Sequence, residues 1–176
     1  MIRAAFILCL ALVGLSAVAD EVDLSAVSSL KVDLGAVVEL EQVRPVDGVT
    51  TAAQPDEAGF KVFAENGYGV VIDLRTEGED RGLDEPAVVE ALGMDYINLP
   101  IGRDGITHAN AKALQALIDA YDQPVLVHCA SANRVGALFA LNEFRKTEDV
   151  EKALAAGRAA GMTRLEGMVK ELLDVD

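Results

Sequence analysis

The chain contains 176 residues, of which 51% are hydrophobic, and its 29 acidic and 15 basic side chains give a formal net charge of −14. This length suits one ordinary domain with a substantial buried core. The acidic surplus makes nucleic acid and anionic membrane surfaces poor partners, so an anionic substrate would need a local cationic site.

The N-terminal segment has the pattern of a secretory signal peptide. Arg3 precedes an uncharged apolar run at residues 4–18, and the small residues Ala17 and Ala19 frame a cleavage site. The run is shorter than the roughly 20 residues that a membrane span needs. We therefore expect residues 1–19 to be removed on export to the periplasm or the medium, leaving no membrane contact.

The remaining chain divides into a short leader and one domain. Residues 20–35 show no sustained hydrophobic period and are interpreted as a leader, whereas residues 36–176 are interpreted as a single domain. Cleavage leaves Cys129 as the one cysteine, so an internal disulfide is excluded. The sequence leaves the oligomeric state open.

Strand and helix patterns alternate along this domain. In chain order we expect a strand at 37–43, a turn at 45–48, a helix at 55–66, a strand at 69–75, a helix at 85–92, a strand at 95–99, a helix at 108–121, a strand at 124–128, and helices at 134–146, 147–160 and 163–173. Apolar spacing, Thr107 as an N-cap, and Gly67 and Gly93 as stops set these boundaries.

Strands separated by helices predict a three-layer α/β fold with a mostly parallel central sheet flanked by helices. Ligands bind such sheets at the carboxyl ends of the strands. Arg75, the loop at 101–105 and Cys129 each follow a predicted strand, so we expect them to converge on one pocket.

Cys129 closes the apolar run at 124–128, and Arg134 opens the next predicted helix. The residues between them are Ala130, Ser131, Ala132 and Asn133. Backbone N–H groups in such a loop can form a nest for a tetrahedral anion, and an arginine can bind two of its oxygens. The pattern indicates a nucleophilic thiolate beside an anion site, although a cysteine can also serve as a small buried hydrophobe.

The segment resembles the active-site loop of the cysteine-dependent protein tyrosine phosphatase superfamily, His-Cys-(x)n-Arg. With Gln54-Pro55, G-V-V-I-D-L-R and Y-I-N-L-P, it is similar to the bacterial phosphatase-like group named after beta-lactamase hydrolase-like proteins, over roughly residues 44–173. The resemblance implies that Cys129 forms a thiophosphate and that Arg134 binds phosphoryl oxygens. It further implies a phosphorylated protein or a small phosphate ester as substrate, and no cofactor.

The same resemblance places a general acid on the loop after the strand at 96–100, where Asp104 is the candidate; an ordinary Asp-Gly turn is the alternative. Arg75 is predicted to add charge to the pocket, or else to pair with an acidic neighbour. Those neighbours are Glu77, Glu79 and Asp80. Two histidines and one cysteine in separate elements make a zinc site improbable.

Two further residues carry structural expectations. The ring of His128 should hydrogen-bond backbone, orient the loop and point away from the Cys129 side chain. Gly136 should allow its helix to pack closely against a neighbour.

The loop departs from the usual superfamily pattern in three ways. Four residues rather than five separate Cys129 from Arg134, Ala132 stands near the usual glycine, and Val135 replaces a hydroxyl residue, for which Ser131 is a substitute. A six-residue loop also resembles that of rhodaneses, which carry sulfur as a persulfide. Two alternatives to a phosphatase therefore remain: a sulfurtransferase using Cys129, and a catalytically degenerate module that only binds anions.

Overall fold

The computed structural model describes residues 43–46 and 48–173. The predicted signal peptide at 1–19, the leader at 20–35 and nearly all of the strand expected at 37–43 lie outside these residues. Within the described part of the chain, no helix is both long enough and apolar enough to cross a membrane.

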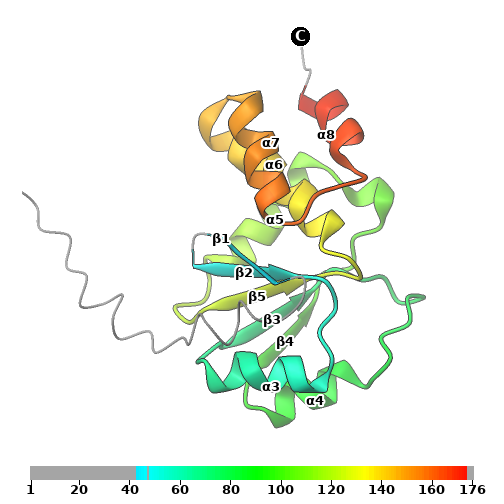
Figure 1. Ribbon diagram of the computed structural model, residues 1–176, viewed down its shortest axis with the longest axis vertical. Helices are drawn as coiled ribbons and strands as arrows, with labels where there is room; N and C mark the ends of the chain where they lie inside the picture. The colour runs from blue at the N-terminus through cyan, green and yellow to red at the C-terminus, as the bar shows by residue number, and fades with distance from the viewer. Residues whose placement is uncertain (1–42, 47, 174–176) are drawn as a thin grey trace, which may run out of the picture. The chain divides into compact units, whose positions relative to one another are not determined.

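A five-stranded sheet in the order β1-β2-β5-β3-β4 forms the centre of the described region (Figure 1). Its strands are β1 (Val43–Val46), β2 (Val49–Ala52), β3 (Val70–Asp73), β4 (Asp95–Asn98) and β5 (Val125–His128). Strand β5 pairs in parallel with β2 and with β3, and β3 pairs in parallel with β4. Strand β1 pairs antiparallel with β2 at the edge. The predicted mostly parallel sheet is confirmed.

Helices cover both faces of this sheet, which gives the predicted three layers. Figure 1 shows α3 (Glu57–Glu65) and α4 (Glu85–Ala91) on one face, and α5 (His108–Ile118), α6 (Asn133–Thr147), α7 (Val150–Ala159) and α8 (Glu166–Leu173) on the other. Alternate strand residues serve the two cores: Val71 and Leu126 pack on the side of α3 and α4, whereas Ile72 and Val127 pack on the other side. The inner strands β3 and β5 are buried along their whole length and therefore read as nearly continuous apolar runs.

Most predicted helix boundaries are confirmed by their caps. The Thr107 side chain accepts a hydrogen bond from the backbone N of Asn110 at 3.2 Å, and Gly67 and Gly93 follow their helices with φ of 82° and 81°. The helix predicted to reach residue 121 ends earlier, at Ile118.

Two strands were not anticipated from the sequence. Strand β1 shares only Val43 with the strand expected at 37–43 and includes two residues of the turn expected at 45–48, so that turn prediction is wrong in part. Strand β2, which falls in no predicted element, is buried between β1 and β5. Two of its four residues are threonines, Thr50 and Thr51, which reduce the apolar character that marked the other inner strands. Short strands of this composition are recognisable mainly by their neighbours in the sheet.

Helices α6 and α7 lie in very close contact because glycines face each other. A Cβ atom added at Gly136 would lie 2.2 Å from the backbone N of Met162 and 2.5 Å from the carbonyl oxygen of Gly157. The expectation that Gly136 permits close helix packing is confirmed.

We predict that Gly136→Ala destabilises the protein by about 3 kcal/mol or more, because backbone atoms cannot yield to the added methyl group. Urea unfolding monitored by circular dichroism measures this loss. Gly167→Ala is the matched control, since nothing lies within 4 Å of its added Cβ. An exposed helical alanine there should stabilise by about 0.5–1 kcal/mol; equal effects at the two positions would contradict the packing argument.

Candidate active site

The predicted cysteine loop connects β5 to α6. Cys129 follows the last residue of β5 and is completely buried, and its backbone N donates to the carbonyl oxygen of Ala52 at 3.4 Å. The chain then turns through Ala132, whose φ of 60° is left-handed, directly before α6 begins. This left-handed residue stands at the place where glycine is usual in the resembled loop, and an L-residue there costs about 1 kcal/mol or more.

The segment that connects α7 and α8 contacts the loop and holds its conformation. The Oδ1 atom of Asn133 accepts hydrogen bonds from the backbone N of Thr163 at 2.8 Å and of Leu165 at 3.3 Å. Gly161 lies so close that a Cβ added to it would be 2.5 Å from the Cβ of Ala132. Contacts from a distant segment therefore hold the loop in a compact conformation.

Arg134 is held by a carboxylate that the sequence did not single out as its partner. Its Nη1 and Nη2 atoms each donate to Glu79 at 2.6 Å, and Nη1 also donates to the carbonyl oxygen of Ile101 at 3.0 Å. A guanidinium has five N–H donors, so these contacts leave the N–H of Nε and one N–H of Nη2, and the guanidinium is also within hydrogen-bonding reach of Cys129. The Glu79 pair orients the arginine without consuming its anion-binding edge.

Glu79 and Arg134 each stabilise the charged form of the other, and Arg134 also interacts with Cys129. The hydrogen bonds from Arg134 lower the pKa of Glu79 to about 2, and burial opposes them. The pKa of Arg134 is raised mainly by its hydrogen bond to Glu79, against burial, and further by the charge and hydrogen bonding of Cys129. Arg134 therefore stays cationic and lies within electrostatic reach of the thiol.

A pocket of about 370 Å³ opens above the loop. Its lining consists of Arg103, Ala130, Ser131, Asn133, Arg134, Arg164 and Leu165. The structure thus brings the predicted Ala130, Ser131, Asn133 and Arg134 together, whereas Cys129 and Ala132 are buried and do not line the pocket. Of the three segments expected to converge there, only the loop at 101–105 contributes to the lining, through Arg103.

Asp104 lies in the 3₁₀ turn η1 (Arg103–Gly105), directly beside the lining residue Arg103. Its side chain is exposed and is not part of the lining. The turn itself was one of the two interpretations of the Asp-Gly pair, and the role of Asp104 as general acid stays a prediction.

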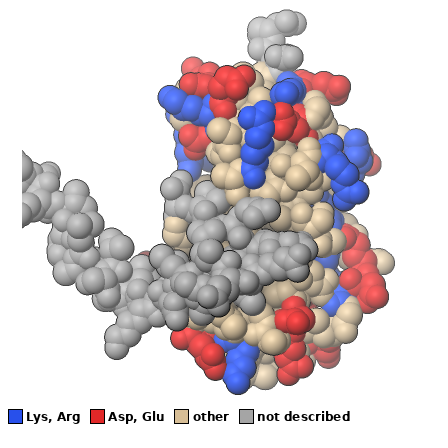
Figure 2. Space-filling model, viewed as in Figure 1, with Lys and Arg blue, Asp and Glu red and all other residues tan. Residues whose placement is uncertain are grey.

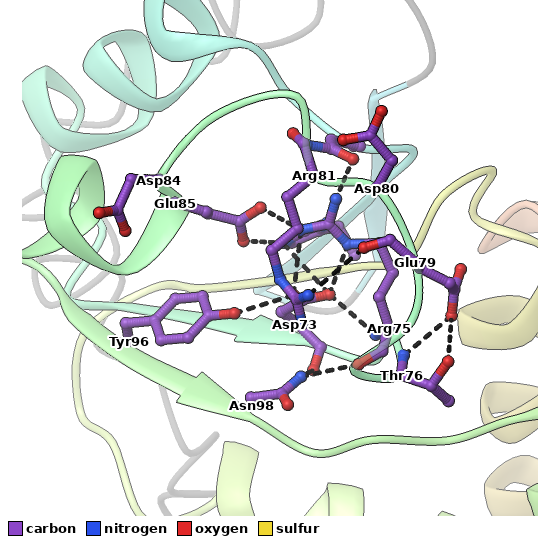
Figure 3. Close-up of polar contacts among 12 residues, drawn as sticks. Asp73, Arg75, Thr76, Glu79, Asp80, Arg81, Asp84, Glu85, Tyr96 and Asn98 are labelled. Carbon is purple, nitrogen blue, oxygen red and sulfur yellow. Dashed lines mark hydrogen bonds and ion pairs between the residues drawn. The ribbon is translucent and has the colours of Figure 1, made fainter.

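Arg75 does not line this pocket but is completely buried. Its guanidinium pairs with Asp73 and Glu85 (Figure 3). It also donates to the side-chain oxygen of Gln54. The predicted pairing with Glu77, Glu79 or Asp80 is therefore wrong. The structure gives Arg75 the role of a buried counter-ion, in place of the predicted contact with substrate, because two carboxylates buried nearby require its positive charge.

Asp73 is the centre of this buried network. Its carboxylate accepts hydrogen bonds from the Arg75 Nε at 2.9 Å, the Arg81 Nε at 3.2 Å and the Tyr96 hydroxyl at 2.9 Å. Burial alone would raise the pKa of Asp73, but the hydrogen bonds from Arg75 and the other donors outweigh it and lower the pKa. Burial, with further contributions from Asp73, raises the pKa of Tyr96 to about 12.

His128 joins the same network and is completely buried. Its Nε2 atom lies 2.8 Å from the Oε1 of Glu85, so the expected hydrogen bond to backbone is wrong: the partner is a carboxylate from α4. The ring lies edge-on to Phe60, on the face of α3, whereas Cys129 packs in the opposite core. The prediction that His128 points away from the cysteine is confirmed.

Asp73, Glu85 and His128 offer ligand atoms within 4.8 Å of one another, a geometry that can hold a cation. The Arg75 guanidinium already supplies the positive charge between the two carboxylates. These residues therefore fit a paired ionic network, and we assign them no role as metal ligands.

Comparison with known proteins agrees with the sequence motifs. The family model of the beta-lactamase hydrolase-like protein, phosphatase-like domain, matches residues 42–146. Beta-lactamase hydrolase-like proteins from Xylella fastidiosa and Agrobacterium fabrum are 36% identical over 118 residues (62% of the chain) and 32% identical over 108 residues (59% of the chain). The matches cover 27% and 25% of those relatives, so the chain spans about a quarter of their length.

Solved structures share the fold at low sequence identity. A candidate phosphatase from Neisseria meningitidis is 20% identical, with a TM-score of 0.66, and the match covers 77% of this chain and 98% of that one. The structure of Tk-PTP in its active form is also 20% identical, with a TM-score of 0.60 over 77% of this chain and 99% of that one.

The buried network predicts a large stability loss when one carboxylate is neutralised. In Glu85→Gln the shape is kept, but Arg75 loses a charged partner in a fully buried site, so we expect a loss of about 3–5 kcal/mol in the free energy of unfolding. Chemical denaturation measures it. Glu90→Gln, on the exposed face of the same helix, should change stability by less than about 0.5 kcal/mol; a similarly small loss for Glu85→Gln would contradict the network.

The Glu79–Arg134 pair predicts a specific dependence of stability on pH. The pKa of Glu79 is about 2 in the folded protein, below its ordinary value of 4.5, so the pair stabilises fully above pH 4.5 and loses its effect as the pH falls through 2. The stability difference between wild type and Glu79→Gln should shrink by roughly half or more from pH 6 to pH 3. Urea titrations at both pH values measure it, with Glu77→Gln as the control for removing an acidic side chain from the same segment.

Proposed function

We propose that this chain, which belongs to the family of beta-lactamase hydrolase-like protein, phosphatase-like domains, hydrolyses phosphate monoesters through a thiophosphate on Cys129. The observation that supports this most is the pairing of a buried cysteine with an arginine whose Nε and Nη2 edge is left available by Glu79. That edge matches two oxygens of a phosphoryl group. Family membership supports a phosphatase-like domain, and the thiophosphate is the finer step that we propose.

The proposed reaction uses Cys129 as the nucleophile and Asp104 as the general acid and base. The Cys129 thiolate attacks phosphorus, the P–O bond to the leaving group breaks, and Asp104 protonates the departing oxygen. Water then attacks the thiophosphate with Asp104 as the base, the S–P bond breaks, and inorganic phosphate leaves. Arg134 and the backbone N–H groups of the loop, at the start of the 15-residue α6, stabilise the equatorial oxygens in both steps.

The proposed substrate is a phosphorylated protein or a small phosphate ester, and the proposed location is the periplasm or the medium, after removal of residues 1–19. The pattern of Arg3, the apolar run and Ala17-Val18-Ala19 supports export.

The length of the loop favours sulfur transfer as a second candidate function. Cys129 to Arg134 is six residues, as in rhodaneses. In that reaction the thiolate attacks the outer sulfur of thiosulfate, sulfite leaves, and cyanide takes the sulfur from the persulfide. This reaction needs no general acid, so Asp104 would have no role in it.

A paired assay on protein beginning at Asp20, kept under reductant, distinguishes these functions. We expect hydrolysis of an aryl phosphate that is abolished in Cys129→Ser, and no sulfur transfer from thiosulfate to cyanide. Sulfur transfer without phosphate release would overturn the proposal. Silence in both assays would favour an anion-binding module.

Asp104→Asn tests the proposed general acid. We expect kcat/KM to fall about 10²- to 10⁴-fold with a poor leaving group such as phenol, and much less with p-nitrophenol, because the latter leaves without a proton. Asp119→Asn, an exposed position at the end of α5, is the matched control. An equal loss with both leaving groups would argue for a different role.

A further inference from the structure

The pocket above the cysteine loop combines three arginines from separate elements. Arg134 comes from α6, Arg103 from η1, and Arg164 from the connection between α7 and α8. As far as the described residues go, its lining contains no carboxylate, although the chain carries a formal charge of −14. Figure 2 shows acidic and basic side chains intermixed over the face in view. The positive lining is thus a local exception.

Two of these arginines have no counter-ion. Arg103 and Arg164 are exposed, and neither forms an ion pair within the described part of the chain. Other arginines contrast with them: Arg158 pairs with Glu166, and the buried Arg75 pairs with Asp73 and Glu85. Arg134 and the backbone N–H groups of the loop already supply donors for one phosphoryl group, so the guanidinium groups of Arg103 and Arg164 are donors in addition to these.

The backbone of Arg164 is fixed relative to the loop. Asn133 accepts hydrogen bonds from the backbone N of Thr163 and of Leu165, the residues on either side, and Leu165 is buried. A loop residue that lines the pocket therefore sets the position of the neighbouring arginine.

The backbone of Arg103 is fixed in a similar way. The flanking Ile101 and Ile106 are both buried, and the backbone N of Ile106 donates to the carbonyl oxygen of Arg103 at 3.3 Å. The side chain of Asn110 donates to the carbonyl oxygen of Gly105 at 2.8 Å. Both unpaired arginines thus extend from rigid positions, which reduces the entropy lost when they bind a ligand.

We infer that the pocket binds phosphoesters that carry a second anionic group, with Arg134 and the loop on the phosphoryl group and Arg103 and Arg164 on the second anion. This inference rests on the proposed function and specifies its substrate class. The shared chemistry is an oxyanion, either a carboxylate or a second phosphate, near the phosphoester. Charge-assisted hydrogen bonds to two guanidinium groups recognise it.

Direct binding to the Cys129→Ser protein tests the inference without turnover. Isothermal titration compares phenyl phosphate, the same ester with a meta-carboxylate, and benzene-1,3-bisphosphate. We expect at least one doubly anionic ligand to bind about 10-fold or more tightly than phenyl phosphate. The preferred ligand then distinguishes a carboxylate from a phosphate as the second group.

The preference should fall to about twofold or less in Arg103→Gln and in Arg164→Gln, each made in the Cys129→Ser background. Arg145→Gln in that background removes one positive charge outside the pocket and should retain the preference, which separates local recognition from net charge. Equal affinity for all three ligands, or a preference unchanged by both pocket variants, would overturn the inference.

Hydrolysis of the same three ligands by the wild-type protein is measured separately from binding. Hydrolysis without a preference at the binding step would overturn this inference and leave the proposed function standing. A preference at the binding step without hydrolysis would overturn the proposed function while supporting a pocket for doubly anionic ligands.

Discussion

Four buried ionisable side chains, Asp73, Arg75, Glu85 and His128, impose the constraint on which the rest of the structure depends. They come from β3, the segment after it, α4 and β5, and all are fully buried. Charges removed from water in this way are tolerable only while every partner stays in place. The network therefore fixes the relative positions of two central strands and a helix. His128 belongs to this network and immediately precedes Cys129. The network therefore also fixes the end of β5, where the cysteine loop begins.

The loop is held from two opposite sides. Beneath it, on the side of α3 and α4, the buried network determines where β5 ends. On the other side, Asn133 accepts hydrogen bonds from the segment between α7 and α8, and Glu79 holds Arg134 by two hydrogen bonds. Donors held in this way need little rearrangement when charge develops on a bound phosphoryl group, which is the physical basis of electrostatic preorganisation.

Local patterns were sufficient to predict most elements and the loop. The helix caps, the apolar inner strands and the Cys129–Arg134 spacing are signals contained within short segments, and each led to the correct element. Contacts between segments far apart in the sequence could not be predicted from such local signals. Glu79 stands in an acidic stretch whose members look equivalent, and nothing near Arg164 marks it as a neighbour of the loop. Neither alternative for Arg75, a place in the pocket or a pair with Glu77, Glu79 or Asp80, included Glu85, because that partner becomes adjacent only through folding.

The contact between Asn133 and the connection from α7 to α8 bears on where this domain ends. The region matched by the family model stops at residue 146, before α7 begins. A fragment cut at that point would keep Cys129 and Arg134 but would lose the backbone amides of Thr163 and Leu165 that hold Asn133. The folded domain is therefore longer than the stretch by which the family is recognised, and the two C-terminal helices are structural parts of the phosphatase-like domain.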